Sequence, residues 1–433
     1  MSNDIQNFWK KPENASPESA PPVRPGGSSL PPKAPQKPPV AGPVAPSYQP
    51  SNVRQATTSV RQLTLDELLI KLLDLKGSDL HLTAGMPPMI RLHGELEPLE
   101  GYQPLGSDQI KEMLFAIMSE DKQAEFLREH EMDLAHSIPG RSRFRVNVLQ
   151  ARKSVGSVIR VIPNDIKSLQ QLGMPEGLAE FAHLPRGLVL VTGPTGSGKS
   201  TTLAAIIDAA NQMRRDHILT IEDPIEFVHE NKGCIVTQRE IGDDTKSFPQ
   251  ALKRALRQDP DIILVGEMRD PETISIAITA AETGHLVFGT LHTQSAAETM
   301  SRIIDSFPDG SKEQIRAQLA ATLQGIVCQT LLKTLDGRGR VAAMEILKGE
   351  PSIRALIRKG AEQQIRSALE TGVAKGMQTL DMSLLSLVRA NKVGIDDAAT
   401  RSTNAEEFYR QLGGEAEVIK IRRRQQELGG TRV

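Results

Sequence analysis

The feature that most constrains the fold of this chain is the glycine-rich run GPTGSGKS at residues 193–200. An apolar run, Leu188 to Val191, comes before it, and a helix-compatible stretch from Thr201 to Ala210 follows. This order of strand, loop and helix is typical of a phosphate-binding loop, in which backbone N–H groups surround a phosphate, a lysine reaches the outer phosphates and a hydroxyl suits Mg²⁺. We therefore expect a nucleoside triphosphate and Mg²⁺ here. The predicted ligands are Gly193, Pro194, Thr195, Gly196, Ser197, Gly198, Lys199, Ser200 and Thr201.

Composition limits the class of protein. With 433 residues and 39% hydrophobic content, the chain can form two or three ordinary globular domains. Its 52 Lys and Arg balance 53 Asp and Glu, so no overall basic field indicates a bulk nucleic-acid binder. Cys234 and Cys328 are isolated, which argues against a zinc site or a disulfide framework and fits a reducing cytoplasm. No apolar stretch approaches 18 residues and the N-terminus is polar, so we expect any membrane association to be peripheral.

Shifts in composition and pattern divide the chain. The first 60 residues hold 13 of its 28 prolines and cannot bury enough apolar surface to fold. Later, apolar strand runs alternate with helical segments, which predicts a parallel-type sheet flanked by helices, and from about Glu298 the pattern is helical only. The predicted divisions are a disordered head (1–60), an α+β domain (61–162), a hinge or linker (163–183), an α/β phosphate-loop core (184–345), a helical region (346–413) and a polar, solvated tail (414–433).

Individual elements follow from local signals. Thr64 is three residues before Glu67 and opens a leucine-rich amphipathic stretch, which predicts a helix with a capping box. A helical pattern runs from 107 to 128. The predicted strands are 79–82, 89–93, 144–148, 158–161, 188–192, 217–222, 261–266 and 285–290.

Hydrolysis of a triphosphate needs carboxylates at the ends of strands that neighbour the loop. One predicted strand ends in Glu222 and is followed by Glu226, and another ends in Glu267. His285 and His292 bracket a third short strand, and they would lie near the phosphates if that strand joins the same sheet. Taken singly, such acids are often solvated caps and such histidines are often structural. Their order within 110 residues favours a shared site.

These segments also carry a resemblance. The phosphate loop, TIEDPIEF, ALRQDPDIILVGEMRDPET and TGHLVFGTLHT together resemble the secretion ATPases that drive type II secretion and type IV pili. The chain is most similar to the pilus retraction (PilT-type) ATPases of twitching motility, since SDLHL at 78–82 and RLHG at 91–94 resemble their PAS-like N-terminal domain. Residues 352–358 resemble their C-terminal retraction helix, with Ser352 and Ala355 in place of Ala and Asn. A helix there would present Arg354 and Arg358 together.

The resemblance implies a RecA-like phosphate-loop domain, a PAS-like N-terminal domain and a helical C-terminal extension. It implies an ATP-hydrolysing homohexamer that powers pilus retraction from the cytoplasmic face of the inner membrane. Its expected partners are the inner-membrane pilus platform protein and the pilus base, without stable nucleic-acid binding.

Residue roles combine this resemblance with the chemistry. Ser200 and Glu267 would organise Mg²⁺, and Glu226 would orient the attacking water, with Glu267 as a rival for that role. Glu222 is placed in the nucleotide site, and His285 and His292 would sense the γ-phosphate. The resemblance also implies cationic fingers from the N-terminal domain or a neighbouring subunit, for which the residues are Arg141, Arg143, Arg145 and Arg160. Alternatively, these arginines only solvate an exposed strand face.

Three other functions stay open at this stage. An ATPase of pilus assembly or type II secretion is disfavoured because those proteins typically carry a four-cysteine metal module that this chain lacks. A nucleic-acid motor built on the same core is disfavoured by the balanced charge and 3% aromatic content. A non-hydrolysing nucleotide-gated scaffold is disfavoured by Glu226 and Glu267.

Overall fold

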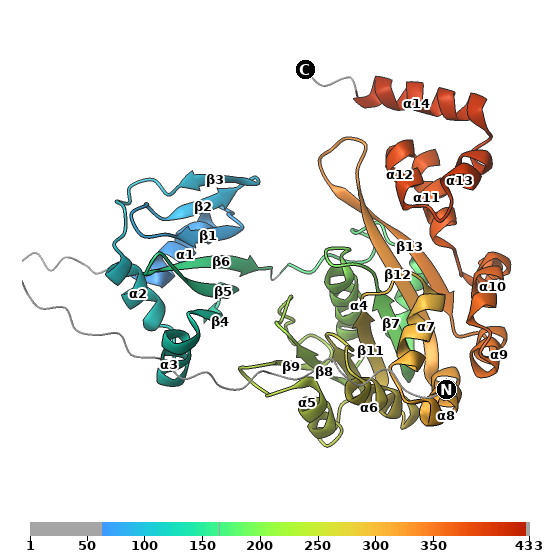
Figure 1. Ribbon diagram of the computed structural model, residues 1–433, viewed down its shortest axis with the longest axis horizontal. Coiled ribbons are helices and arrows are strands. Elements are labelled where there is room, and N and C mark those ends of the chain that lie inside the picture. The colour runs from blue at the N-terminus through green and yellow to red at the C-terminus, as the bar shows by residue number, and fades with distance from the viewer. Residues whose placement is uncertain (1–62, 164, 430–433) are drawn as a thin grey trace, which may run out of the picture. The chain divides into compact units, whose positions relative to one another are not determined.

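The computed structural model describes residues 63–163 and 165–429, and these residues form two β-sheets (Figure 1). One sheet has six strands in the order β3-β2-β1-β6-β5-β4. The other has seven strands in the order β13-β12-β7-β11-β10-β8-β9. The predicted proline-rich head, residues 1–60, lies outside the described residues.

The N-terminal domain packs helices against the six-stranded antiparallel sheet. In chain order its elements are α1 (Leu65–Asp74), β1 (Asp79–Leu82), β2 (Met89–Leu92), β3 (Glu95–Pro98), α2 (Ser107–Phe115), α3 (Glu120–Glu129), β4 (Glu131–Ile138), β5 (Ser142–Ala151) and β6 (Ser154–Ile162). The Thr64 hydroxyl accepts a hydrogen bond from the Glu67 N–H, and the Glu67 carboxylate accepts one from the Thr64 N–H, so the predicted capping box is confirmed. Leu68, Ile110 and Phe144 are fully buried in the core between helices and sheet.

The sequence pattern predicts four of these six strands, which are β1, β2, β5 and β6. It misses β3, whose four residues are all exposed, because no apolar alternation marks that strand. It also misses β4. The helical pattern over 107–128 is two helices rather than one, since the Ser119 hydroxyl caps α3 by accepting the Lys122 N–H.

The seven-stranded sheet is parallel except for β13 at one edge. Its first part comprises β7 (Gly187–Thr192), α4 (Lys199–Met213), β8 (His217–Glu222), β9 (Ile235–Glu240), α5 (Phe248–Ala255), β10 (Ile262–Val265), α6 (Pro271–Glu282) and β11 (Leu286–Leu291). Leu188 and Leu190 of β7 lie in the core on one face of the sheet, and Val189 and Val191 lie in the core on the other. Because both faces are covered, the central strands β7, β10 and β11 are largely apolar, as the sequence pattern predicts, whereas the edge strand β9 is polar over residues 237–240 and the pattern misses it.

The chain does not stay helical after Glu298, so that prediction is wrong. The elements α7 (Ala296–Asp305) and α8 (Asp309–Thr322) are followed by the long hairpin β12 (Leu323–Lys333) and β13 (Arg340–Lys348), which adds two strands beside β7. Strand β12 begins at the residue after α8 ends, with no glycine or proline between them, and most of its residues are buried. A buried run without alternation or punctuation cannot be told from a helix by periodicity.

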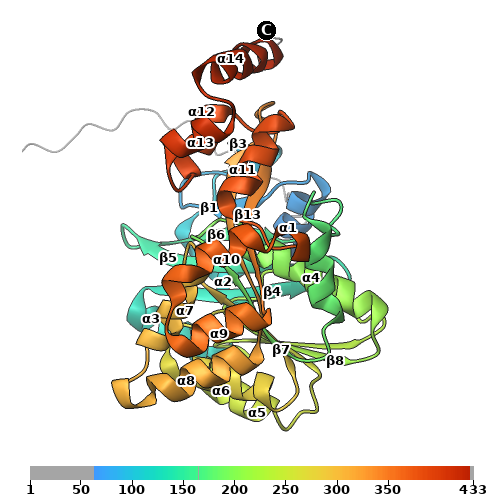
Figure 2. The ribbon, with the colours of Figure 1, turned by 90° about the vertical axis from the view of Figure 1, so that its right-hand side faces the viewer.

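Helices complete the C-terminal part of the described chain (Figure 2). They are α9 (Pro351–Lys359), α10 (Ile365–Thr371), α11 (Leu380–Arg389), α12 (Ile395–Arg401), α13 (Ala405–Gln411) and α14 (Glu415–Gly429). Helix α9 buries Ile353 and Ile357, as its spacing predicts. It does not present Arg354 as a free cation, because that guanidinium donates hydrogen bonds to the carbonyls of Ala320 and Ala321 at the end of α8.

The polar stretch 414–433 is not a solvated tail over its described residues. It forms α14, whose Val418 and Gln425 are buried against α12 and α13. The Gln425 amide accepts a hydrogen bond from the Ile395 N–H and donates one to the Val393 carbonyl, which caps the start of α12. Among the helices of residues 63–163 and 165–429, none is long and apolar enough to span a membrane.

Candidate active site

The glycine-rich loop joins β7 to α4 at the carboxyl edge of the parallel sheet. Gly193, Gly196 and Gly198 have φ angles of 139°, 77° and 88°, a region that side chains other than glycine rarely adopt. A Cβ atom on Gly193 would lie 2.2 Å from the Gln329 carbonyl oxygen, so glycine is also required by the close packing of the loop against β12. The loop therefore wraps tightly in front of the N-terminus of α4, where backbone N–H groups favour a phosphate.

Gln329, in β12, holds this loop from behind, and sequence reasoning missed it. Its side-chain amide donates to the Ser197 carbonyl at 2.7 Å, and its amide oxygen accepts from the Thr202 hydroxyl at 2.7 Å. Gln329 is 3% exposed. A glutamine inside the apolar run IVCQTLL was the available signal, because a buried amide needs partners.

Lys199 lies inside the site rather than in solvent. Its ammonium donates to the Gly193 carbonyl at 2.8 Å and to the Pro194 carbonyl at 3.2 Å, and it lies 3.5 Å from Nδ1 of His292. Burial lowers the pKa of Lys199, while the negative charge of Glu267 opposes that effect. The ammonium is thus held beside the loop by groups that a phosphate oxygen can replace.

Glu267 follows β10, and its carboxylate is bound by Arg269 and His292. Nε2 of His292 lies 2.8 Å from its carboxylate, and the Arg269 guanidinium forms an ion pair with the same oxygen. Burial alone would raise the pKa of Glu267, but Arg269 and His292 hold it below its usual value. This carboxylate is therefore ionised near neutral pH. His292 lies between Glu267 and Lys199 and connects them.

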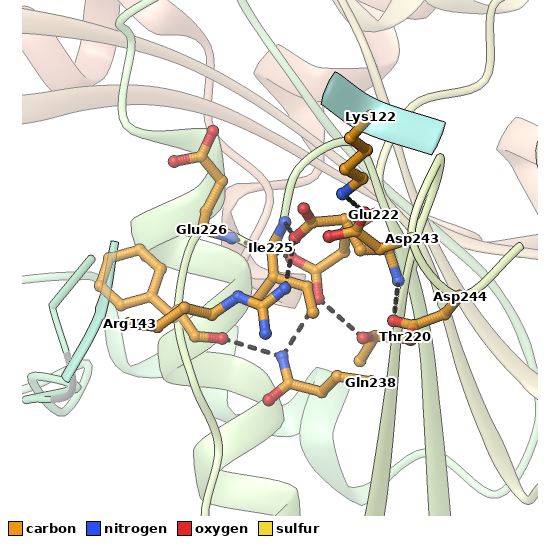
Figure 3. Close-up of polar contacts among 11 residues, drawn as sticks. Lys122, Arg143, Thr220, Glu222, Ile225, Glu226, Gln238, Asp243 and Asp244 are labelled. Carbon is orange, nitrogen blue, oxygen red and sulfur yellow. Dashed lines mark hydrogen bonds and ion pairs between the residues drawn. The ribbon is translucent and has the colours of Figure 1, made fainter. Parts of the chain in front are cut away.

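Glu222 and Glu226, the two acids at and after the end of β8 that we expect near the phosphates, have different surroundings. Glu222 is buried, and its carboxylate accepts hydrogen bonds from the Thr220 hydroxyl, the Gln238 amide and the Glu226 backbone N–H. Burial raises the pKa of Glu222. Glu226 is exposed, and Figure 3 shows its carboxylate pointing away from this cluster. Glu222 thus supports the loop backbone, whereas the Glu226 side chain is available to a ligand.

One cavity of about 230 Å³ brings these groups together. Its lining includes Thr195, Gly196, Lys199, Ser200, Glu222, Glu226, Glu267 and His292. The Ser200 hydroxyl and the Glu267 carboxylate supply hard oxygen donors of the kind that Mg²⁺ takes alongside phosphate and water. Among the described residues no group of three or more His, Cys, Asp and Glu forms a metal site. Two protein oxygens beside a phosphate loop fit Mg²⁺ that is held largely by the nucleotide.

His285 does not lie in this cavity, so its expected place near the phosphates is wrong. The next residue, Leu286, pairs with Gly187 at the start of β7, and the loop begins only after Thr192 at the end of that strand. Parallel strands advance about 3.3 Å per residue, so His285 lies at the opposite edge of the sheet. Its Nδ1 instead lies 2.9 Å from the Ala280 carbonyl.

The four arginines have different surroundings. Arg160 pairs with Asp79 within the N-terminal domain, and Arg141 lies 3.7 Å from Asp74. Arg143 is bound to Glu240 of β9, 97 residues later in the chain. Arg145 lines another cavity beside Asp223, Pro224 and Glu240, and it has no hydrogen bond or ion pair to the residues that the structure describes.

Comparison with known proteins agrees with this geometry. A family model described as "Type II/IV secretion system protein" matches residues 117–406. The chain belongs to this family. Within the family, it is 50% identical over 346 residues to the type IV pilus retraction ATPase PilT of Pseudomonas aeruginosa. The matched region covers 80% of this chain and 100% of that protein. It is 50% identical over 319 residues to a twitching motility protein of Neisseria gonorrhoeae, covering 74% and 85% of the two chains.

A solved structure extends the likeness to the fold. The crystal structure of the pilus retraction motor PilT with bound ADP superposes with a TM-score of 0.75 at 44% identity, covering 80% of this chain and 99% of that one. The predicted fold class, an α/β phosphate-loop domain with an α+β N-terminal domain and C-terminal helices, is confirmed.

Proposed function

We propose that this chain is the ATP-hydrolysing motor that retracts type IV pili. The observation that carries the proposal is the cavity in which the phosphate loop, Lys199, Glu226, Glu267 and His292 meet at the carboxyl edge of a parallel sheet. Relatives at 50% identity named as a pilus retraction ATPase and a twitching motility protein support the retracting direction. The structural neighbour with bound ADP supports nucleotide binding at this loop.

Each group has a role that follows from its environment. The loop N–H groups and Lys199 hold the phosphates, and Ser200 with Glu267 hold Mg²⁺, which when bound offsets negative charge on the phosphates. Glu226 orients the attacking water, because its carboxylate is exposed to the cavity while that of Glu267 is engaged by Arg269 and His292. His292 senses the γ-phosphate through Lys199. A phosphate that draws the Lys199 ammonium away from the loop carbonyls also changes its contact with Nδ1 of His292.

The motor works as a homohexamer at the cytoplasmic face of the inner membrane, where it acts on the platform protein and the pilus base. Arg145 is our choice among the four arginines for a finger that reaches a nucleotide, because it is exposed and has no hydrogen-bond or ion-pair partner among the described residues. If Arg145 reaches the nucleotide only when the domains close, ATP hydrolysis is coupled to that domain movement.

Two experiments test the proposal. In a ring, Arg145→Ala subunits mixed with wild-type protein should depress ATP turnover by more than their fraction, whereas a strictly linear loss would indicate independent monomers. In cells that lack the chain, we expect more surface pili and no twitching. Loss of surface pili would instead indicate a motor that assembles the fibre.

The assignment of the carboxylates is tested by two amide variants. Glu226→Gln keeps the shape of the side chain but cannot take a proton from water, so nucleotide binding should persist while turnover is lost. If Glu267→Gln abolishes turnover and Glu226→Gln does not, the two roles are reversed.

A further inference from the structure

Strand β9 supports the loop that carries Glu226, and it does so on both sides of that residue (Figure 3). On one side, the carboxylate of Glu240 accepts a hydrogen bond from the Ile225 N–H at 3.0 Å. On the other side, the Gln238 amide donates to the Phe227 carbonyl at 2.8 Å and accepts from the His229 N–H at 2.7 Å. Gln238 and Glu240 are two residues apart in a strand, so they project from the same face of β9. The backbone on either side of Glu226 is therefore fixed by two side chains.

Glu240 has a second partner that Gln238 lacks. Its Oε2 atom, the same oxygen that binds Ile225, also accepts a hydrogen bond from Nη2 of Arg143 at 3.0 Å. The Glu240 side chain is only 6% exposed and that of Arg143 is 23% exposed. Burying a carboxylate costs free energy unless a cation or several donors bind it, so the hydrogen bonds from Arg143 and Ile225 together offset the burial of Glu240.

Arg143 comes from the N-terminal domain. In β5, Phe144 and Val146 point into that domain's core, and Arg143 lies on the opposite face of the strand. The guanidinium is thus bound outside its own domain, to a residue that touches the backbone beside Glu226. One carboxylate oxygen joins the N-terminal domain to the loop.

We propose that Glu240 is a positioning residue for ATP hydrolysis, which holds the loop carrying Glu226 in place and makes that position depend on Arg143 of the N-terminal domain. The inference rests on the proposed role of Glu226. When Arg143 is withdrawn, the Glu240 carboxylate is left buried without its cation, which favours movement of the side chain toward water and away from Ile225. Glu226 then loses its alignment, while the phosphate loop keeps its own support from Gln329.

A matched control lies on the same segment. Lys122 of α3 forms an ion pair with Asp243, so this second pair also joins the N-terminal domain to the segment after β9. Neither residue makes a hydrogen bond to loop 223–229 among the described contacts. Asp243→Asn therefore removes an ion pair between the same two parts of the chain and leaves the bonds at Ile225 intact.

The experiment uses the full chain and compares Glu240→Ala, Glu240→Gln and Asp243→Asn. Steady-state ATP turnover, ADP affinity and the thermal unfolding midpoint are measured for each. A displacement of about 1 Å at a reacting group costs on the order of 10²-fold in rate, so we expect Glu240→Ala to lower kcat by 10-fold to 100-fold with ADP affinity unchanged within twofold. Glu240→Gln keeps an acceptor for Ile225 and should lose less. Asp243→Asn should stay within twofold of wild type.

Three results would overturn the inference. These are a kcat for Glu240→Ala within twofold of wild type, an equal loss of kcat in Asp243→Asn, and a loss of ADP affinity that parallels the loss of kcat. Glu226→Gln measured alongside separates this inference from the assignment beneath it. If Glu226→Gln retains turnover, the role of Glu226 fails, whatever the Glu240 variants do.

A double-mutant cycle tests the link to the N-terminal domain. If Arg143 acts through Glu240, Arg143→Ala should lower kcat in the wild-type chain but add less than a twofold loss to Glu240→Ala, which has no acceptor for the guanidinium. Multiplicative losses in the double variant would mean that Arg143 acts elsewhere, as a finger on a nucleotide does, and the coupling would be refuted.

Discussion

Replacing Gln329 by Leu tests how the phosphate loop is held. Leucine fills a similar volume but leaves the Ser197 carbonyl and the Thr202 hydroxyl without the two 2.7 Å hydrogen bonds that they form with the amide. Ser197 is 3% exposed and Thr202 is fully buried, so water does not readily replace the lost partner. An unpaired buried polar group costs about 1–3 kcal/mol, which gives about 2–6 kcal/mol for the two.

The assay combines thermal unfolding with ADP binding. A loss of 2 kcal/mol corresponds to a fall of about 4 °C in the unfolding midpoint for a domain of this size, so we expect at least that change. ADP affinity should fall as well, because the bond to Ser197 lies within the loop. The control is the double variant Gln329→Leu with Thr202→Val, which removes both partners of one hydrogen bond and should lose less stability than the sum of the single variants. A midpoint within 1 °C of wild type for Gln329→Leu would refute the reasoning.

Three further predictions concern other parts of the chain. Lys199→Ala should abolish ATP turnover without lowering the unfolding midpoint, and turnover near the wild-type rate would contradict the assignment of the loop. Burial lowers the pKa of His229 from its usual 6.5 to about 4, so this residue stabilises the fold fully above pH 6.5 and progressively less as the pH falls toward 4. The difference in unfolding free energy between His229→Gln and wild type should therefore change by about 2 kcal/mol between pH 7 and pH 5, and an unchanged difference would contradict a buried neutral imidazole. Arg354→Ala should lower the unfolding midpoint, because it removes the hydrogen bonds that cap the end of α8. Arg358 is exposed, so Arg358→Ala should leave folding and ATP turnover intact. Arg358→Ala is therefore the variant that tests the effect of α9 on twitching.

The sequence predicts those parts of the fold that local rules decide. The capping box at Thr64 and Glu67, the glycine loop, the strand before it and the helix after it have local sequence signals within a few residues. The hairpin β12 and β13 escapes prediction because β12 pairs on one side with β7, which precedes it by more than a hundred residues, and its pattern resembles that of a helix. Periodicity identifies burial, and it does not say which surface buries the segment.

The residues of the site also fall into two groups, those that the sequence predicts and those that it does not. The residues that we propose contact the nucleotide have recognisable spacing, and the structure brings Lys199, Glu226, Glu267 and His292 to one cavity. Residues that hold the loops have no such spacing, since Glu240 is 15 residues from Ile225 and Gln329 is 132 residues from Ser197. A sequence motif cannot encode a contact of this kind, because only the packing of the strands determines which side chain reaches which backbone group.

Separate supports for the two loops have a consequence for the motor. The phosphate loop is held by Gln329 from β12, within the sheet itself, whereas the loop carrying Glu226 is held by Glu240, whose carboxylate also binds Arg143 of the N-terminal domain. Movement of that domain away from β9 would thus disturb alignment of the water-orienting carboxylate and leave nucleotide binding largely unchanged. A subunit would therefore, under the proposed mechanism, keep its ATP while hydrolysis is prevented. Under the proposed mechanism, variants at the contact between Arg143 and Glu240 should therefore change kcat at constant nucleotide affinity, and variants at Gln329 should change affinity itself.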